Sequence, residues 1–198
     1  TADDLNERLE VFKGNSFAKA AIEICWWTLQ SQITGKPLHR LLGGETHEGS
    51  AGADFGIQDS IDMLLGNIQQ AVDAEFPRIK LKVGRGWDLD MLRAVTSTFP
   101  DMTFHIDCNS GYSLDDLPFF KAIDGMGLAF IEQPLYYADV LDHAELARQI
   151  ETPICLDESA YSVKAVEQAI QVEACKYVNI KPGRIGGLAN AIAVHDLC

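Results

Sequence analysis

Five short apolar runs in the sequence each end in a polar residue that can do chemistry. The runs read IKLK, FHID, AFIE, ICLD and VNIK, and they end at Lys82, Asp107, Glu132, Asp157 and Lys181. Successive end residues are 25, 25, 25 and 24 residues apart. A near-constant interval of this size indicates one repeated supersecondary unit. Three carboxylates flanked by two lysines at this spacing predict a single site.

The three carboxylates are candidate ligands of a metal ion. Asp107, Glu132 and Asp157 offer oxygen atoms, which hard divalent cations such as Mg²⁺ prefer. Without a cation, carboxylates gathered at one point would repel one another and resist ionisation. Taken singly, each is an ordinary acidic residue among the 29 in the chain. The periodic set favours Mg²⁺, with Mn²⁺ or another divalent cation as a substitute.

The two lysines are candidate acids and bases. Side chains alternate along a strand, so Lys80 and Lys82 share one face. A neighbouring cation disfavours the ammonium form of a lysine and lowers its pKa. We therefore predict Lys82 as a general base, with Lys181 acting from the opposite side of the substrate. The alternative is that both lysines only form interior salt bridges to the carboxylates.

Further polar residues surround these five in the sequence. Four of them are predicted to contact the substrate or to support the ligands: Lys80, Asn109, Asn179 and Gly183. A purely structural turn is the alternative for Gly183, because KPGRIGG lacks the ending of a phosphate loop. We expect His105 to be a hydrogen-bonded interior histidine and Cys155 to be a packing residue. Glu158 should point away from the site if its strand continues past Asp157.

The elements that carry these residues indicate a parallel sheet. A short buried strand followed by a helix of about ten residues is a βα unit. In a (β/α) barrel the carboxyl ends of the strands meet at one mouth. Six strands are expected, at residues 51–57, 78–83, 103–107, 128–132, 153–157 and 177–181. Helices are expected from Ser16, as the N-cap, to Gly35, at 38–42, 59–75, 89–99, 114–123, 139–150 and 163–172, and from Leu188.

The predicted fold class is therefore α/β, a TIM-like (β/α) barrel of which only about six strands are present. Six strands leave such a barrel open, so we expect the chain to be a piece of a longer protein. Apolar residues make up 47% of the 198, enough for a substantial core. The net charge of −13 argues against nucleic acid and anionic membranes as partners. Five scattered cysteines and the lack of a signal-peptide pattern indicate reduced thiols in a cytoplasmic protein.

The ordered motifs KLK, DCN, IEQP, LDES and NIKPGRIGG resemble the enolase superfamily, in its muconate-lactonizing-enzyme-like branch. The likeness is greatest to N-acylamino acid racemases and o-succinylbenzoate synthases, through HAELARQIETPICLDES and VNIKPGRIGG. By this resemblance, residues 1–45 are the C-terminal helical part of an α+β capping domain. Residues 46–198 are then the barrel through its sixth strand.

The resemblance also implies a reaction, namely Mg²⁺-dependent removal of the proton α to a carboxylate through an enediolate. In racemisation, Lys82 and Lys181 would exchange protons on the two faces of the α-carbon. In o-succinylbenzoate synthesis, a step of menaquinone biosynthesis, Lys82 would take the proton and Lys181 would stabilise the enediolate. Lys80 would hold the carboxylate of a small-molecule substrate, and the full-length protein would be a homo-oligomer. The alternatives are a dipeptide epimerase, a muconate cycloisomerase, and a non-catalytic metal-binding barrel or inactive fragment.

Overall fold

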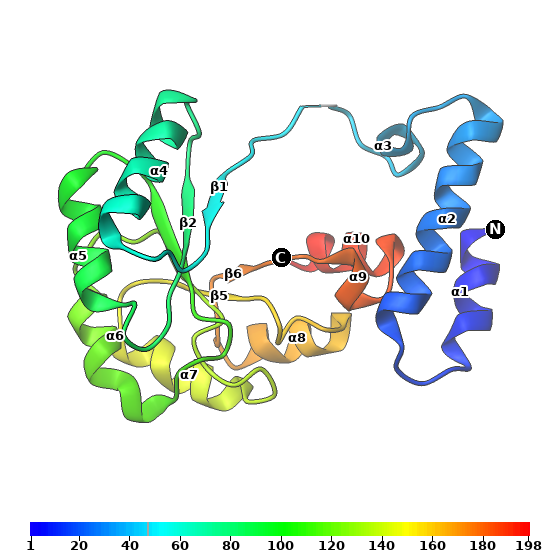
Figure 1. The fold of residues 1–198 in the computed structure, drawn as a ribbon. Coiled ribbons are helices and arrows are strands. Elements are labelled where there is room, and N and C mark those ends of the chain that lie inside the picture. The colour runs from blue at the N-terminus through cyan, green and yellow to red at the C-terminus, as the bar shows by residue number, and fades with distance from the viewer. Residues whose placement is uncertain (47) are drawn as a thin grey trace. The chain divides into compact units, whose positions relative to one another are not determined.

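The computed structural model describes residues 1–46 and 48–198 (Figure 1). His47, within the predicted barrel segment 46–198, lies outside the described residues. The chain divides into two compact units. The helical unit comprises residues 1–49, 160–167 and 180–198, and the sheet unit comprises residues 50–159 and 168–179.

The sheet unit is built on six parallel strands whose order in the sheet is their order in the chain (Figure 1). The strands are β1 (Ala53–Phe55), β2 (Ile79–Lys82), β3 (Phe104–Asp107), β4 (Ile131–Glu132), β5 (Ile154–Leu156) and β6 (Tyr177–Val178). Consecutive βα units place each strand beside the previous one in this way. The predicted α/β fold with six strands is confirmed. The last strand is shorter than predicted, so Asn179 and Lys181 follow β6 and are not part of it.

The strand register aligns the chemically active residues. Lys82 pairs with Asp107, and Asp107 pairs with Glu132, in the ladders β2–β3 and β3–β4. One layer deeper, Lys80 pairs with His105. Neighbouring strands lie about 4.8 Å apart, so residues in register can contact one another directly. Asp157 comes directly after β5.

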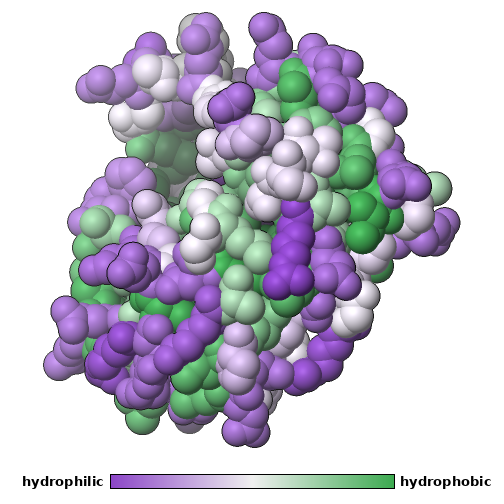
Figure 2. Space-filling model, turned by 90° about the vertical axis from the view of Figure 1, so that its left-hand side faces the viewer, coloured by the Kyte–Doolittle hydropathy of each residue, from purple (hydrophilic) through white to green (hydrophobic). Residues whose placement is uncertain are grey.

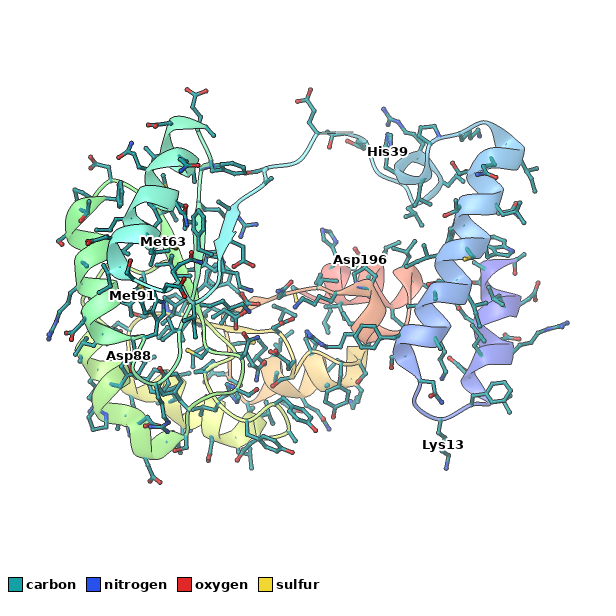
Figure 3. All side chains as sticks on the ribbon, in the orientation of Figure 1. Lys13, His39, Met63, Asp88, Met91 and Asp196 are labelled. Atoms are coloured by element: carbon teal, nitrogen blue, oxygen red, sulfur yellow. The ribbon has the colours of Figure 1, made fainter. Side chains whose placement is uncertain are left out.

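Helices cover one face of this sheet (Figure 1). They are α4 (Ile61–Asp73), α5 (Leu89–Thr98), the 3₁₀ turn η1 (Leu114–Asp116), α6 (Leu117–Ile123) and α7 (Val140–Gln149). Helix α8 (Val163–Gln171) follows β5 in the chain, and its residues up to 167 belong to the helical unit. Ser60 Oγ accepts a hydrogen bond from Met63 N at 3.1 Å, which makes Ser60 the N-cap of α4. Asp88 caps α5 by accepting from Leu89 N at 2.6 Å; Figure 3 labels Asp88 and the core residue Met91.

The core between helices and sheet determines which way the lysines point. Ile79 and Leu81 of β2 are buried among core residues such as Ile68, Leu92 and Phe120. Each such side chain contributes roughly 1.5–3 kcal/mol when fully buried. Lys80 and Lys82, which alternate with them along β2, therefore point to the other face of the sheet.

The molecular surface turned to the viewer in Figure 2 is largely hydrophilic and is interrupted by apolar patches.

The helical unit contains α1 (Ala2–Glu10), α2 (Ser16–Thr34), α3 (Leu38–Leu41), α9 (Pro182–Ile185) and α10 (Leu188–Leu197). Helix α1 was not predicted, because its residues are polar and none of them is buried; its signal is the capping box between Thr1 and Asp4. The prediction that Ser16 is the N-cap of α2 is wrong. Asn15 occupies that position with φ 57°, and Ser16 is the first helical residue. Asn tolerates this left-handed conformation better than most residues.

A buried carboxylate organises the helical unit. Glu23 of α2 is fully buried and accepts hydrogen bonds from Leu188 N and, at 3.1 Å, from Ala189 N, at the start of α10. Its other donor is Asn6 Nδ2, at 3.1 Å. Gly187 has φ 142°, and a Cβ there would clash with Glu23 Oε2, so only glycine fits. Glu23 thus replaces a local N-cap of α10 from a distant helix.

Within residues 1–46 and 48–198, the helices are too short or too polar for any of them to cross a bilayer.

Candidate active site

The side chains at the ends of β2, β3 and β4 form one charged cluster in the sheet unit. Lys80 Nζ lies 2.7 Å from Asp107 Oδ2 and 2.9 Å from Glu132 Oε2. Lys82 Nζ lies 2.5 Å from the same Asp107 oxygen. Asp107 is 1% and Glu132 2% exposed, so the two ammonium groups balance carboxylates that are removed from water. The structure therefore brings four predicted site residues into direct contact.

Burial and charge act in opposite directions on the pKa values in this cluster. Burial lowers the pKa of Lys80, but hydrogen bonds to Asp107 and Glu132 outweigh it and raise this pKa above its ordinary value. Burial raises the pKa of Asp107, but Lys80, Lys82 and the Asn109 N–H together lower it below its usual range. Lys80 is consequently a fixed cation at neutral pH, and Asp107 is a fixed carboxylate.

Asn109 links Lys82 to the loop that follows β5. Its Oδ1 accepts from Lys82 Nζ at 2.6 Å, and its Nδ2 donates to Glu158 Oε1 at 3.0 Å. Its backbone N–H donates to Asp107 Oδ1 at 2.9 Å. The expectation for Glu158 depended on a continuing strand, but β5 ends at Leu156. The backbone turns there, so Glu158 faces Asn109.

Asn179 and Asp157 are two further predicted site residues of the sheet unit. Asn179 Nδ2 donates to Glu132 Oε1 at 2.8 Å. Asp157 is fully buried. Among the described residues, no three His, Cys, Asp or Glu side chains are gathered closely enough to hold a metal ion as they stand. Lys80 instead bridges Asp107 and Glu132, and the ligand role of the three carboxylates stays a prediction.

Two of the predicted site residues belong to the helical unit. Lys181 is half-buried and is the N-cap residue of α9, where its carbonyl accepts from Arg184 N at 2.9 Å and Ile185 N at 3.1 Å. A Cβ on Gly183 would lie 2.9 Å and 3.0 Å from two ring carbons of Phe17. This contact favours a structural role for Gly183, because a larger residue there would displace the ring of Phe17, which lies against α9. The catalytic role of Lys181 stays a prediction.

His105 lies under the cluster and is buried, with its ring 4.3 Å from the ring of Phe130. His105 was predicted to be hydrogen-bonded, and for Nδ1 this prediction is wrong, because that nitrogen has no partner among the residues that the structure describes. Burial, aided by the charges of Arg78 and Lys80, lowers the pKa of His105 to about 4. It is therefore neutral at pH 7. Cys155 is buried as expected, and this burial raises the pKa of its thiol.

An uncharged network beside the cluster was not predicted from the sequence. It joins Gln133, His143 and Ser159, which are all buried. Gln133 stands in the IEQP motif directly after Glu132, so its place could have been noticed. Nothing in the sequence indicates His143, because α7 brings it to the site from a helix.

A family model described as enolase C-terminal domain-like matches residues 64–198, which include β2 to β6 and the whole charged cluster. The chain belongs to this family. The predicted resemblance to the enolase superfamily is thereby confirmed. The sheet unit of this enolase-family chain is part of a (β/α) barrel.

Similar proteins are enzymes. The o-succinylbenzoate synthase of Geobacillus kaustophilus is 43% identical over 195 residues, covering 98% of this chain and 52% of that protein. The N-succinylamino acid racemase of Thermus thermophilus is 42% identical over 193 residues, with the same coverage. A crystal structure of an enolase-superfamily member from Listeria innocua is 34% identical with a TM-score of 0.94, covering 100% of this chain and 53% of the other. The enolase-family chain thus spans about half the length of the curated relatives it matches.

Proposed function

We propose that the protein carrying this chain removes the proton α to a carboxylate, as an o-succinylbenzoate synthase, an N-acylamino acid racemase, or both. One relative named o-succinylbenzoate synthase is 43% identical to this chain, and another named N-succinylamino acid racemase is 42% identical. The observation that carries the proposal is the cluster of Lys80 and Lys82 on one strand face against Asp107 and Glu132. Carbon acids of this kind need a positioned base and strong electrostatic stabilisation of the anion.

The two lysines of β2 are suited to different roles. The side chain of Lys82 is 31% exposed and that of Lys80 15% exposed, so Lys82 is the more accessible to a substrate. Lys82 would remove the proton, held in place by Asp107 and by the Asn109 carboxamide. Lys80, a fixed cation, would contact the substrate carboxylate. Lys181 would be the opposite acid or base in racemisation, and an electrostatic stabiliser in synthesis.

The carboxylates fit a divalent cation by their chemistry. Asp107, Glu132 and Asp157 supply buried oxygen ligands of the type that Mg²⁺ prefers, with Mn²⁺ or another divalent cation as a substitute. When bound, the cation would neutralise the substrate carboxylate and stabilise the enediolate. Asn109 and Asn179 already donate to Asp107 and Glu132 and would keep these carboxylates oriented.

The biological setting belongs to the same proposal. The substrate is a small carboxylic acid, and the synthase activity would serve menaquinone biosynthesis. We place the protein in the cytoplasm, where its five free cysteines would stay reduced. The full-length protein is expected to form a homo-oligomer.

The test measures deuterium exchange at the α-carbon. The full-length protein with Mg²⁺ is incubated in D₂O with an N-acylamino acid and followed by proton NMR, and o-succinylbenzoate formation is assayed in the same preparation. The proposal expects exchange, product formation, or both, and none with Lys82→Ala. Exchange with dipeptides alone would indicate an epimerase. If the protein gives neither exchange nor product, the non-catalytic metal-binding barrel becomes the better explanation.

A further inference from the structure

The carboxamide of Gln133 lies at the end of β5, where the hydrogen bonds of the sheet stop. Asp157 follows the last residue of β5, so its backbone N–H lies beyond the end of that strand. The Gln133 side chain holds this N–H instead, because its Oε1 accepts from Asp157 N and from Ser159 N, each at 3.0 Å. Backbone N–H groups can only donate, so these two contacts determine which end of the carboxamide is oxygen.

The other end of the carboxamide is held as firmly. Gln133 Nε2 donates to Ser159 Oγ at 2.8 Å and to Leu135 O at 3.2 Å. Ser159 Oγ in turn donates to Tyr137 O at 2.8 Å. Gln133 is fully buried, and its φ of 39° lies in the left-handed region. A non-glycine residue retains such a conformation only where its surroundings hold it there.

His143 of α7 anchors this arrangement from behind. Its Nδ1 lies 2.6 Å from the carbonyl of Asp139, which can only accept, so Nδ1 carries the hydrogen. Nε2 is then an acceptor for Leu135 N at 3.3 Å, with Gln133 Nε2 also 3.3 Å away. His143 is fully buried, which lowers its pKa and favours this neutral form.

We propose that Gln133 is a positioning residue that sets Asp157 against Glu132, with His143 and Ser159 holding its carboxamide in place. Gln133 directly follows Glu132, so one side chain ties the backbone of one predicted ligand to that of another. The consequence is that Mg²⁺ affinity depends on Gln133, His143 and Ser159, which do not bind the metal themselves. This consequence rests on the proposed function, in which Asp157 and Glu132 bind Mg²⁺. Changes behind metal ligands typically weaken metal binding about 10–100-fold.

The experiment uses the full-length protein and the variant Gln133→Met, which keeps the unbranched shape and loses every side-chain hydrogen bond. Leu146→Ala is the matched control, because Leu146 is buried in the apolar core on the same helix as His143. The substitution should destabilise the fold by loss of packing, and it removes no hydrogen bond from Gln133. Calorimetric titration with Mg²⁺ alone is expected to give a dissociation constant at least about 10-fold higher in Gln133→Met. The control should stay within about 3-fold of the wild type, because its loss is one of packing.

A second measurement needs no metal. Amide hydrogen exchange at Asp157 and Ser159, followed by NMR, should accelerate in Gln133→Met relative to amides of β3 in the same sample. Unchanged exchange at both amides, or a folded Gln133→Met protein with wild-type Mg²⁺ affinity, overturns the inference. If Gln133→Met does not fold, His143→Phe should show the same two changes to a smaller extent, and their absence there is equally decisive. A wild-type protein that binds no Mg²⁺ would count against the proposed function, while the exchange result still decides the positioning role.

Discussion

The two units each bury carboxylates, and they neutralise them in different ways. In the helical unit, Glu23 is satisfied by two backbone N–H groups and the Asn6 amide, with no cation among these donors. In the sheet unit, Asp107 is held mainly by the ammonium groups of Lys80 and Lys82. Fixed backbone dipoles cannot leave without unfolding a helix end, whereas a lysine side chain can turn aside.

This difference separates a structural carboxylate from one suited to chemistry. Glu23 caps the start of α10, and its backbone partners cannot be replaced by a metal ion or a substrate. The lysines around Asp107 and Glu132 can be replaced by other positive groups, so a metal ion or a substrate can enter the cluster. The comparison predicts that changes in the sheet unit alter activity, and that changes at Glu23 alter stability.

The largest expected effect comes from removing the base. Lys82→Ala in the full-length protein should lower kcat by roughly 10²–10⁴-fold, because a positioned general base contributes about that much. Lys181→Ala should do the same for racemisation, and both variants should keep their Mg²⁺ affinity. Lys164→Ala, at an exposed lysine of α8, is the control and should retain full activity. Substantial kcat in both Lys82→Ala and Lys181→Ala would break the two-lysine mechanism.

The next effect concerns the metal. Glu132→Gln removes one charged ligand and should weaken Mg²⁺ binding by more than about 100-fold, beyond what changes behind the ligands cause. Isothermal titration calorimetry measures this directly. Glu23→Gln is the matched control, the same substitution at the other buried glutamate, and should leave Mg²⁺ affinity unchanged. Equal affinity in Glu132→Gln and the wild type would remove Glu132 from the ligand set.

The third effect concerns stability, and here Glu23, the control in the metal experiment, is the residue expected to matter. Glu23→Gln should lower the free energy of unfolding by about 1.5–2.5 kcal/mol, because the substitution removes the charge and turns one of the two oxygens that accept from α10 N–H groups into a donor. Urea denaturation measures the change. Glu7→Gln, at an exposed position of α1, should have little effect. A Glu23→Gln protein as stable as the wild type would show that Glu23 is not the cap of α10.

The smallest effect is a pH dependence of stability. Burial lowers the pKa of His143 below its ordinary value near 6.5, although the Asp139 carbonyl opposes this. Its contribution is fully present above about pH 6.5 and is lost as the pH falls through the lower folded-state pKa. Between pH 7 and 5, the free energy of unfolding should therefore fall less steeply in His143→Gln than in the wild type, because only the wild type loses the contribution of the neutral imidazole. His195→Gln, at an exposed histidine, should leave the slope unchanged; equal slopes in wild type and His143→Gln would contradict the prediction.

Sequence reasoning found those features that repeat locally. The interval between Lys82, Asp107, Glu132 and Asp157 predicted the parallel strands, because one βα unit has a characteristic length. It missed α1, which is short, has Leu5 and Leu9 as its only large apolar residues and contains no fully buried residue. It also extended the last strand to Lys181, although the ladder stops at Val178.

The sequence by itself determined the residue types, their order along the sheet, and the strand faces that carry them, since each depends on neighbours along the chain. Only the tertiary structure decided the partners. It placed Lys80 between two carboxylates, turned Glu158 toward Asn109, and brought His143 from a helix to support Gln133. These contacts depend on where strands end and on how helices pack against the sheet. Both are settled by long-range packing, which a local pattern of residues does not contain.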